Sequence, residues 1–177
     1  MQNGMRTYKP GQRNNPDAGQ HIAALLAAWR TAKLPVVHVR HISRDARSVF
    51  APGQDGAAFQ RAFAPLPEEH VLEKNVPDAF VHGALERWLH MRAIGHLVIA
   101  GVSTNHSVES TARSAGNLGF RSTVLADATY AYAQPDYAGV WRSAQAVHLM
   151  SLANLDGDHA AVRTTAQVLA QLLATSC

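Results

Sequence analysis

The chain has little cysteine and little lysine. Its 177 residues include one cysteine, Cys177, at the C-terminal end, which excludes an internal disulfide and a cysteine-rich metal site. Its only lysines are Lys9, Lys33 and Lys74, and its arginines are scattered, so the net charge of +3 does not predict the basic face that nucleic-acid binding requires. No apolar run reaches the roughly 20 residues of a membrane span. No signal-peptide pattern opens the sequence, so we expect a soluble, cytoplasmic protein without nucleic-acid or membrane partners.

The composition is that of a folded domain. Hydrophobic residues make up 47% of the chain and charged residues 16%, which excludes a disordered protein. We find no repeat, low-complexity tract or linker. The length fits one domain over residues 1–177.

Strand-like and helix-like patterns alternate along the chain. Residues 36–41, 71–74, 97–100 and 122–126 form short apolar or β-branched runs, and a last strand is expected near 159–163. Between them, helical spacing appears at 22–29, 85–91, 108–118, 140–152 and 164–173. We therefore predict an α/β fold, a three-layer sandwich with a mostly parallel, Rossmann-like sheet.

Polar residues follow three of the expected strands: Lys74, the turn Ser103–Ser107, and Asp127. An open α/β sheet places its chemistry at the carboxyl ends of its strands. Ser107 would lie in the first helical turn, where free N–H groups favour a developing negative charge. The alternative is that Ser103, Thr104 and Asn105 are ordinary N-caps and that Lys74 is a solvated strand end.

Cofactor and metal signals are weak. The ten histidines show no HxH or HxxxH spacing, and His38 and His41 would point to opposite faces of a strand. Neither GxGxxG nor GxxxxGK[ST] occurs. We therefore predict neither a metal nor a cofactor.

Three segments resemble one known family. The segment "VIAGVSTNHSVESTARSAGNLGFRSTVLADAT", residues 98–129, resembles the signature region of the isochorismatase-like hydrolases, also called the cysteine hydrolase superfamily. Residues 68–89 resemble the family's lysine-bearing segment, and residues 34–41 resemble its second strand. The order of the segments is kept, and the likeness covers nearly the whole chain.

The resemblance implies a fold and a set of roles. Family members have a six-stranded, mostly parallel sheet and commonly use an Asp base, a Lys and a Cys nucleophile to cleave small amides. By position, Lys74 matches the lysine and Ser107 stands in place of the cysteine. The Val102–Ser103 bond matches a peptide that is often cis, and the N–H groups of Ser103 and Ser107 would form the oxyanion hole.

Two departures from the family pattern bear on function. A serine hydroxyl replaces the thiol, and a hydroxyl needs a base to activate it. The family's Asp would precede Met1, at the end of a central first strand that this sequence does not contain. From this we expect the sequence to be fragmentary or its start codon misplaced.

The resemblance implies a hydrolase for a small-molecule amide. The alternatives are hydrolysis of a vinyl ether of the isochorismate type, and an inactive member that serves as a binding or assembly module. Phe80, Asn105 and Tyr130 are candidate pocket residues, and loops 42–66 and 130–138 are candidates for setting specificity. The apolar stretch 140–155 suggests a homo-oligomer.

Overall fold

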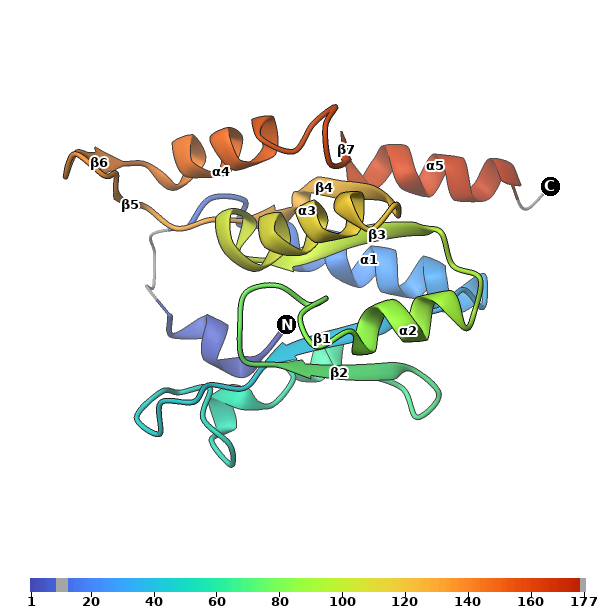
Figure 1. The fold of residues 1–177 in the computed structure, drawn as a ribbon, viewed down its shortest axis with the longest axis horizontal. Helices are drawn as coiled ribbons and strands as arrows, with labels where there is room; N and C mark the ends of the chain where they lie inside the picture. Colours follow the sequence, from blue (N-terminus) through green and yellow to red (C-terminus); the bar gives the residue numbers. More distant parts are fainter. Residues whose placement is uncertain (9–12, 176–177) are drawn as a thin grey trace.

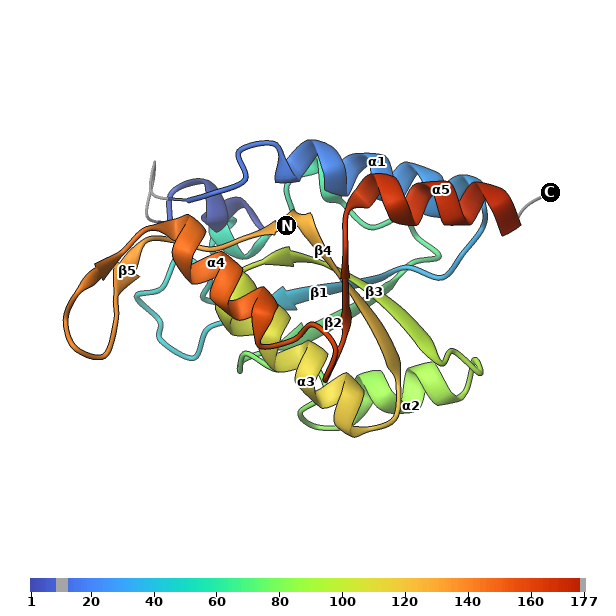
Figure 2. The same ribbon diagram turned by 90° about the horizontal axis from the view of Figure 1, so that it is seen from above.

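The computed structural model describes residues 1–8 and 13–175. The expectations for Lys9 and Cys177 lie outside these residues. Parallel strands form the centre, and helices cover both faces (Figures 1 and 2). No helix in the described part of the chain is long and apolar enough to cross a membrane. The α-helices are α1 (Ala18–Thr31), α2 (Ala84–His90), α3 (Glu109–Asn117), α4 (Ala144–Ala153) and α5 (Thr165–Thr175). The strands are β1 (Val37–His41), β2 (His70–Lys74), β3 (His96–Val102), β4 (Arg121–Tyr130), β5 (Gln134–Pro135), β6 (Trp141–Arg142) and β7 (Ala161–Arg163).

The strands form two parallel sheets and one small hairpin. β1 pairs with β2, and β3, β4 and β7 pair in that order. β5 and β6 form an antiparallel hairpin. The prediction of an α/β fold with mostly parallel strands is confirmed. Among the described residues, however, β1 and β3 do not pair with each other, so the parallel strands belong to two separately hydrogen-bonded sheets.

β4 is the most deeply buried strand, because helices pack on both of its faces. Leu125 packs with α1 and α5, whereas Val124 packs with α3 and α4, and neither side chain is exposed. Figure 2 shows α1 and α5 on one side of the strands and α2 and α3 on the other. This arrangement explains why the consecutive residues Val124 and Leu125 are both apolar, because each points to a face of the strand that helices cover.

A boundary prediction was wrong. Asp127 is not a strand end, because β4 continues to Tyr130. The extension arises where the register of β3 and β4 shifts between Ile99 and Gly101, which lets Gly101 pair with Thr129.

Candidate active site

The candidate site lies where the carboxyl ends of β2 and β3 meet. β2 ends at Lys74, and β3 leads into a π-helical turn, Thr104–Val108, that precedes α3. Ser107 lies in this turn. Because β2 and β3 belong to different sheets, the site joins two parts of the molecule that backbone pairing does not connect directly.

Lys74 and Ser107 are in hydrogen-bonding contact. Lys74 Nζ donates to the carbonyl of Val76 at 2.9 Å and lies 3.0 Å from Ser107 Oγ. Lys74 is only 9% exposed, and Ser107 is half-buried. The side chain of Lys74 is thus shielded from water, and two hydrogen bonds hold its Nζ beside Ser107.

The turn that carries Ser107 differs from the expected N-cap. No side chain caps it; instead the Ser103 carbonyl accepts hydrogen bonds from His106 N at 3.1 Å and Val108 N at 3.2 Å. The second bond spans five residues and makes the turn π-helical, a form frequently found at functional sites. The Val102–Ser103 peptide bond is cis, as the resemblance implied.

A buried polar network holds this turn against α4 and β4. Thr104 is fully buried, and its hydroxyl lies 2.9 Å from His148 Nδ1. Asn15 donates to the carbonyls of Ala126 and Thr129, both at 2.7 Å. Burial lowers the pKa of His148, which favours its neutral form. The network fixes the backbone that presents Ser107.

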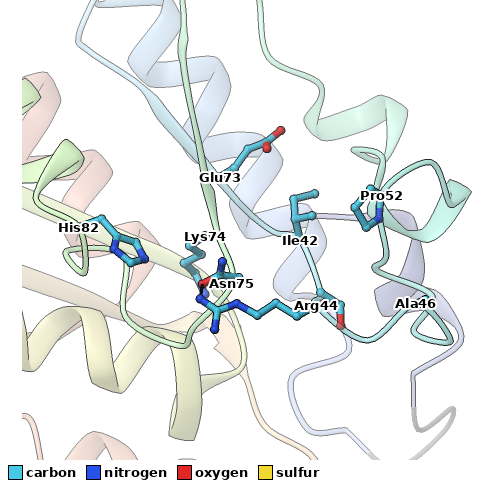
Figure 3. A pocket seen from close by; sticks show the side chains of 9 residues that line it. Ile42, Arg44, Ala46, Pro52, Glu73, Lys74, Asn75 and His82 are labelled. Carbon is cyan, nitrogen blue, oxygen red and sulfur yellow. Dashed lines mark hydrogen bonds between the residues drawn. The ribbon is translucent and has the colours of Figure 1, made fainter.

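A cavity of about 510 Å³ opens beside Lys74 (Figure 3). Arg44 spans it and donates to Asn75 at 3.1 Å, and His82 faces it from the loop before α2. Glu73 also lines the cavity but is paired with Arg40. The volume is within the range of small-molecule sites. The cavity is lined by Ile42, Ser43, Arg44, Ala46, Pro52, Glu73, Lys74, Asn75 and His82.

Burial controls the electrostatics of Lys74. Removal from water lowers the pKa of Lys74 to about 8, and the charge of Asp78 opposes this shift. Asp78 itself is anchored, because it accepts hydrogen bonds from Phe80 N at 2.8 Å and from Ser114 Oγ at 2.6 Å. Near neutral pH, Lys74 can therefore exist in both protonation states.

The other candidate pocket residues lie elsewhere. Phe80 is 6% exposed and packs on Phe120 with ring centroids 5.6 Å apart. Asn105 is half-buried in the turn and does not line the cavity beside Lys74. Tyr130 is buried at the end of β4 and lines a second cavity of about 360 Å³ with Met1 and Tyr132. Their roles as substrate contacts stay predictions.

Asp127 serves the fold rather than this site. Its carboxylate accepts hydrogen bonds from the backbone N–H and the hydroxyl of Thr165, both at 2.8 Å. It therefore binds the start of α5, on the opposite side of β4 from α3. The apparent strand end was misleading because β4 continues past it.

Sequence reasoning did not single out Arg44, Asn75, Asp78 or His82, although Arg44 lies in loop 42–66, a candidate for setting specificity. Asn75 and Asp78 lie in the loop "NVPD" directly after Lys74, and this position was the available signal. No pattern in the sequence singles out Arg44 or His82. In residues 1–8 and 13–175, no group of three His, Cys, Asp or Glu side chains is placed to hold a metal ion.

Comparisons with known proteins agree with this architecture. Residues 1–167 match the model of the isochorismatase domain. The isochorismatase family protein YrdC of Bacillus subtilis is 34% identical, over 94% of this chain and 89% of its own length. A crystal structure from Chromobacterium violaceum, titled a putative isochorismatase-family hydrolase, superposes with a TM-score of 0.95 at 44% identity and covers 98% of this chain and 90% of that one.

A ureidoacrylate amidohydrolase, RutB of Caulobacter vibrioides, is 36% identical over 62% of this chain and 47% of its own length. The match to the domain model covers most of the chain, and the similarity to YrdC extends over nearly all of both proteins. The chain therefore belongs to the isochorismatase family of hydrolases.

Proposed function

We propose that this protein hydrolyses the C–N bond of a small amide, with Ser107 as the nucleophile. The observation that carries the proposal is the 3.0 Å contact between Ser107 Oγ and Lys74 Nζ at the carboxyl ends of parallel strands. The cavity beside Lys74 has room for a small molecule. The related ureidoacrylate amidohydrolase, by its name, acts on a C–N bond, which also favours an amide.

In this mechanism Ser107 Oγ attacks the amide carbon. The carbonyl oxygen then gains negative charge, and the N–H groups of Ser103 and Ser107 would stabilise it at the start of the helical segment. Rigid placement of the donors matters, because a developing charge is best stabilised by dipoles that need not reorient. The bonds from Thr104 to His148 and from Asn15 to β4 support that rigidity.

The proposal also includes association of copies of this chain. Val140, Trp141, Leu149 and Met150 lie on β6, α4 and the loop before β6, and each is at least half exposed. Exposed large apolar side chains favour burial in an interface. Light scattering on the purified protein measures the assembly: a mass near 19.1 kDa would contradict it. Cytoplasmic location stays a prediction.

The test is turnover of a panel of small amides, followed through release of ammonia or amine. We expect the unaltered protein to cleave a member of the panel and Ser107→Ala to lose about 100-fold or more in rate. Ser110→Ala, three residues further along the same segment, is the matched control and should retain activity. Intact-mass measurement should detect an acyl group on Ser107 during turnover.

Three results would contradict the proposal. Equal rates in Ser107→Ala and the unaltered protein would show that Ser107 is not the nucleophile. Cleavage of isochorismate without cleavage of any amide would favour the vinyl-ether reaction. Saturable binding of panel compounds without turnover would favour a binding module.

A further inference from the structure

Lys74 Nζ is held by the loop after β2 as well as by its contact with Ser107. We infer that Asp78 is a positioning residue: it ties this loop to α3 and thereby fixes the Val76 carbonyl that holds Lys74 Nζ beside Ser107. The inference rests on the proposed function, because the placement of Lys74 affects a reaction only if Ser107 reacts. It assigns no proton transfer to Lys74 or to Asp78.

Asp78 anchors the loop through both of its carboxylate oxygens. Oδ1 accepts a hydrogen bond from Phe80 N at 2.8 Å, which closes a turn within the loop. Oδ2 accepts one from Ser114 Oγ in α3 at 2.6 Å. A hydrogen bond to a carboxylate is charge-assisted and stronger than one between neutral groups. The carboxylate is therefore a strong link between the loop and the helix.

The loop, the helix and the site form a closed chain of contacts. Two residues before Asp78, the Val76 carbonyl accepts from Lys74 Nζ at 2.9 Å, and Nζ lies 3.0 Å from Ser107 Oγ. Ser107 lies in the π-helical turn that continues directly into α3, and α3 carries Ser114. Because the chain of contacts closes, Lys74 Nζ cannot move away from Ser107 without disturbing the loop or the helix.

The anchor is needed because the loop has little packing of its own near the site. Val76 is half-buried and Pro77 is exposed, whereas Ala79 and Phe80 are buried. Asp78 lies between these two parts and joins the buried end of the loop to the end that carries Val76. The lysine stem is long and flexible, so its Nζ takes one position only where its partners are held.

Asp78→Ala removes the anchor, and Asp127→Ala is its matched control. Asp127 makes a similar pair of contacts at the start of α5, where it accepts from Thr165 N and Thr165 Oγ1, both at 2.8 Å. Both aspartates are half-buried, so both substitutions should lower stability to a similar extent in urea denaturation. Only Asp78→Ala should alter the site.

The first measurement is the NMR spectrum of the lysine ε-methylene groups, which does not require Ser107 to react. Because the sequence has few lysines, Lys74→Arg and Lys33→Arg identify the signals by loss. The two ε protons of Lys74 should have separate chemical shifts in the unaltered protein, because a held side chain places them in different surroundings. They should merge in Asp78→Ala and stay separate in Asp127→Ala.

The second measurement is covalent labelling of Ser107 by an alkyl fluorophosphonate: Oγ bonds to phosphorus, the P–F bond breaks, and the hydroxyl proton passes to water. Asp78→Ala should label about tenfold or more slowly, because a small displacement of a reacting group lowers the rate. Asp127→Ala should label at the unaltered rate. Asp78→Asn keeps an oxygen for Phe80 N and offers an N–H to Ser114 Oγ, so it should label within about threefold of the unaltered rate.

Three results would overturn the inference. The ε protons of Lys74 could be merged already in the unaltered protein, or could stay separate in Asp78→Ala. Asp78→Ala could label within about threefold of the unaltered rate. Asp78→Asn could label as slowly as Asp78→Ala, which would mean that Asp78 acts through its charge on Lys74 rather than through its hydrogen bonds.

If Asp78→Ala fails to fold, Ser114→Ala removes the link to α3 with a smaller change, and the same two measurements decide. Merged Lys74 signals in Asp78→Ala, in a protein that cleaves no amide and whose Ser107 is not labelled, would support the positioning role and reject the proposed function. Amide cleavage together with unchanged Lys74 signals in Asp78→Ala would do the reverse.

Discussion

The two parallel sheets of this molecule are stabilised in different ways. In the sheet of β3, β4 and β7, Val124 and Leu125 are fully buried between helices on both faces. In the sheet of β1 and β2, burial alternates, and Val71 remains 38% exposed. Beside that second sheet, the buried carboxylate of Glu69 binds Arg30 and His38.

This difference has a consequence for the site. Apolar packing of β4 together with the Thr104–His148 contact places the turn with Ser107. The ion pairs of Glu69 help to place the sheet that ends at Lys74. The Lys74–Ser107 hydrogen bond then links the two sheets at their carboxyl ends. Variants that weaken one sheet should therefore affect stability differently from variants that weaken the other.

The largest expected effect is on the three-stranded sheet. Val124→Ala should lower the free energy of unfolding by about 2–3 kcal/mol, because it removes two fully buried methyl groups and leaves a cavity. Val71→Ala in β2 is the matched control and should cost less than about 0.5 kcal/mol, since that side chain is already partly in water. Urea denaturation of both variants measures the difference. Equal losses would mean that the two sheets are buried to the same extent.

A smaller effect is expected from the ionic cluster beside the two-stranded sheet. Glu69→Gln should cost about 1.5–2 kcal/mol near pH 7, because the charge-assisted bonds to Arg30 and His38 are weakened inside the protein. The Arg30 bond is the main reason that the pKa of Glu69 lies at about 2 rather than 4.5.

A depressed carboxyl pKa stabilises the folded state above the unfolded pKa. The advantage of the unaltered protein over Glu69→Gln should therefore hold above pH 4.5 and fade as pH falls toward 2. Urea denaturation at several pH values measures it. A difference between the two proteins that does not change with pH would show that Glu69 acts by shape rather than by charge.

The smallest expected change in stability concerns the end of β3. Thr104→Val keeps the side-chain shape but removes the partner of buried His148 Nδ1, at a cost of about 1 kcal/mol. Because the turn also carries Ser107, fluorophosphonate labelling should slow along with this loss. Thr111→Val, in α3, is a control for a buried-face threonine hydroxyl that does not contact His148. Unchanged labelling in Thr104→Val would show that the His148 network does not position Ser107.

Local pattern predicted the strands well, since residues 97–100 and 71–74 lie within β3 and β2. It failed where distant pairing decides the outcome. β4 runs three residues past Asp127, to Tyr130, because the register shift with β3 lets Thr129 and Tyr130 pair with Gly101 and Val102. Phe80, a candidate pocket residue, packs against Phe120, forty residues away, and its role as a substrate contact stays a prediction.

The sequence by itself determined the alternation of strands and helices, the parallel sheets and the family, because these depend on local apolar spacing and on motifs with a kept order. Only the tertiary structure decided the chemistry of the site. The Lys74–Ser107 contact joins residues 33 positions apart, on strands of different sheets. The low pKa of Lys74 also comes from burial, which depends on every segment that packs around the side chain rather than on its neighbours in the chain.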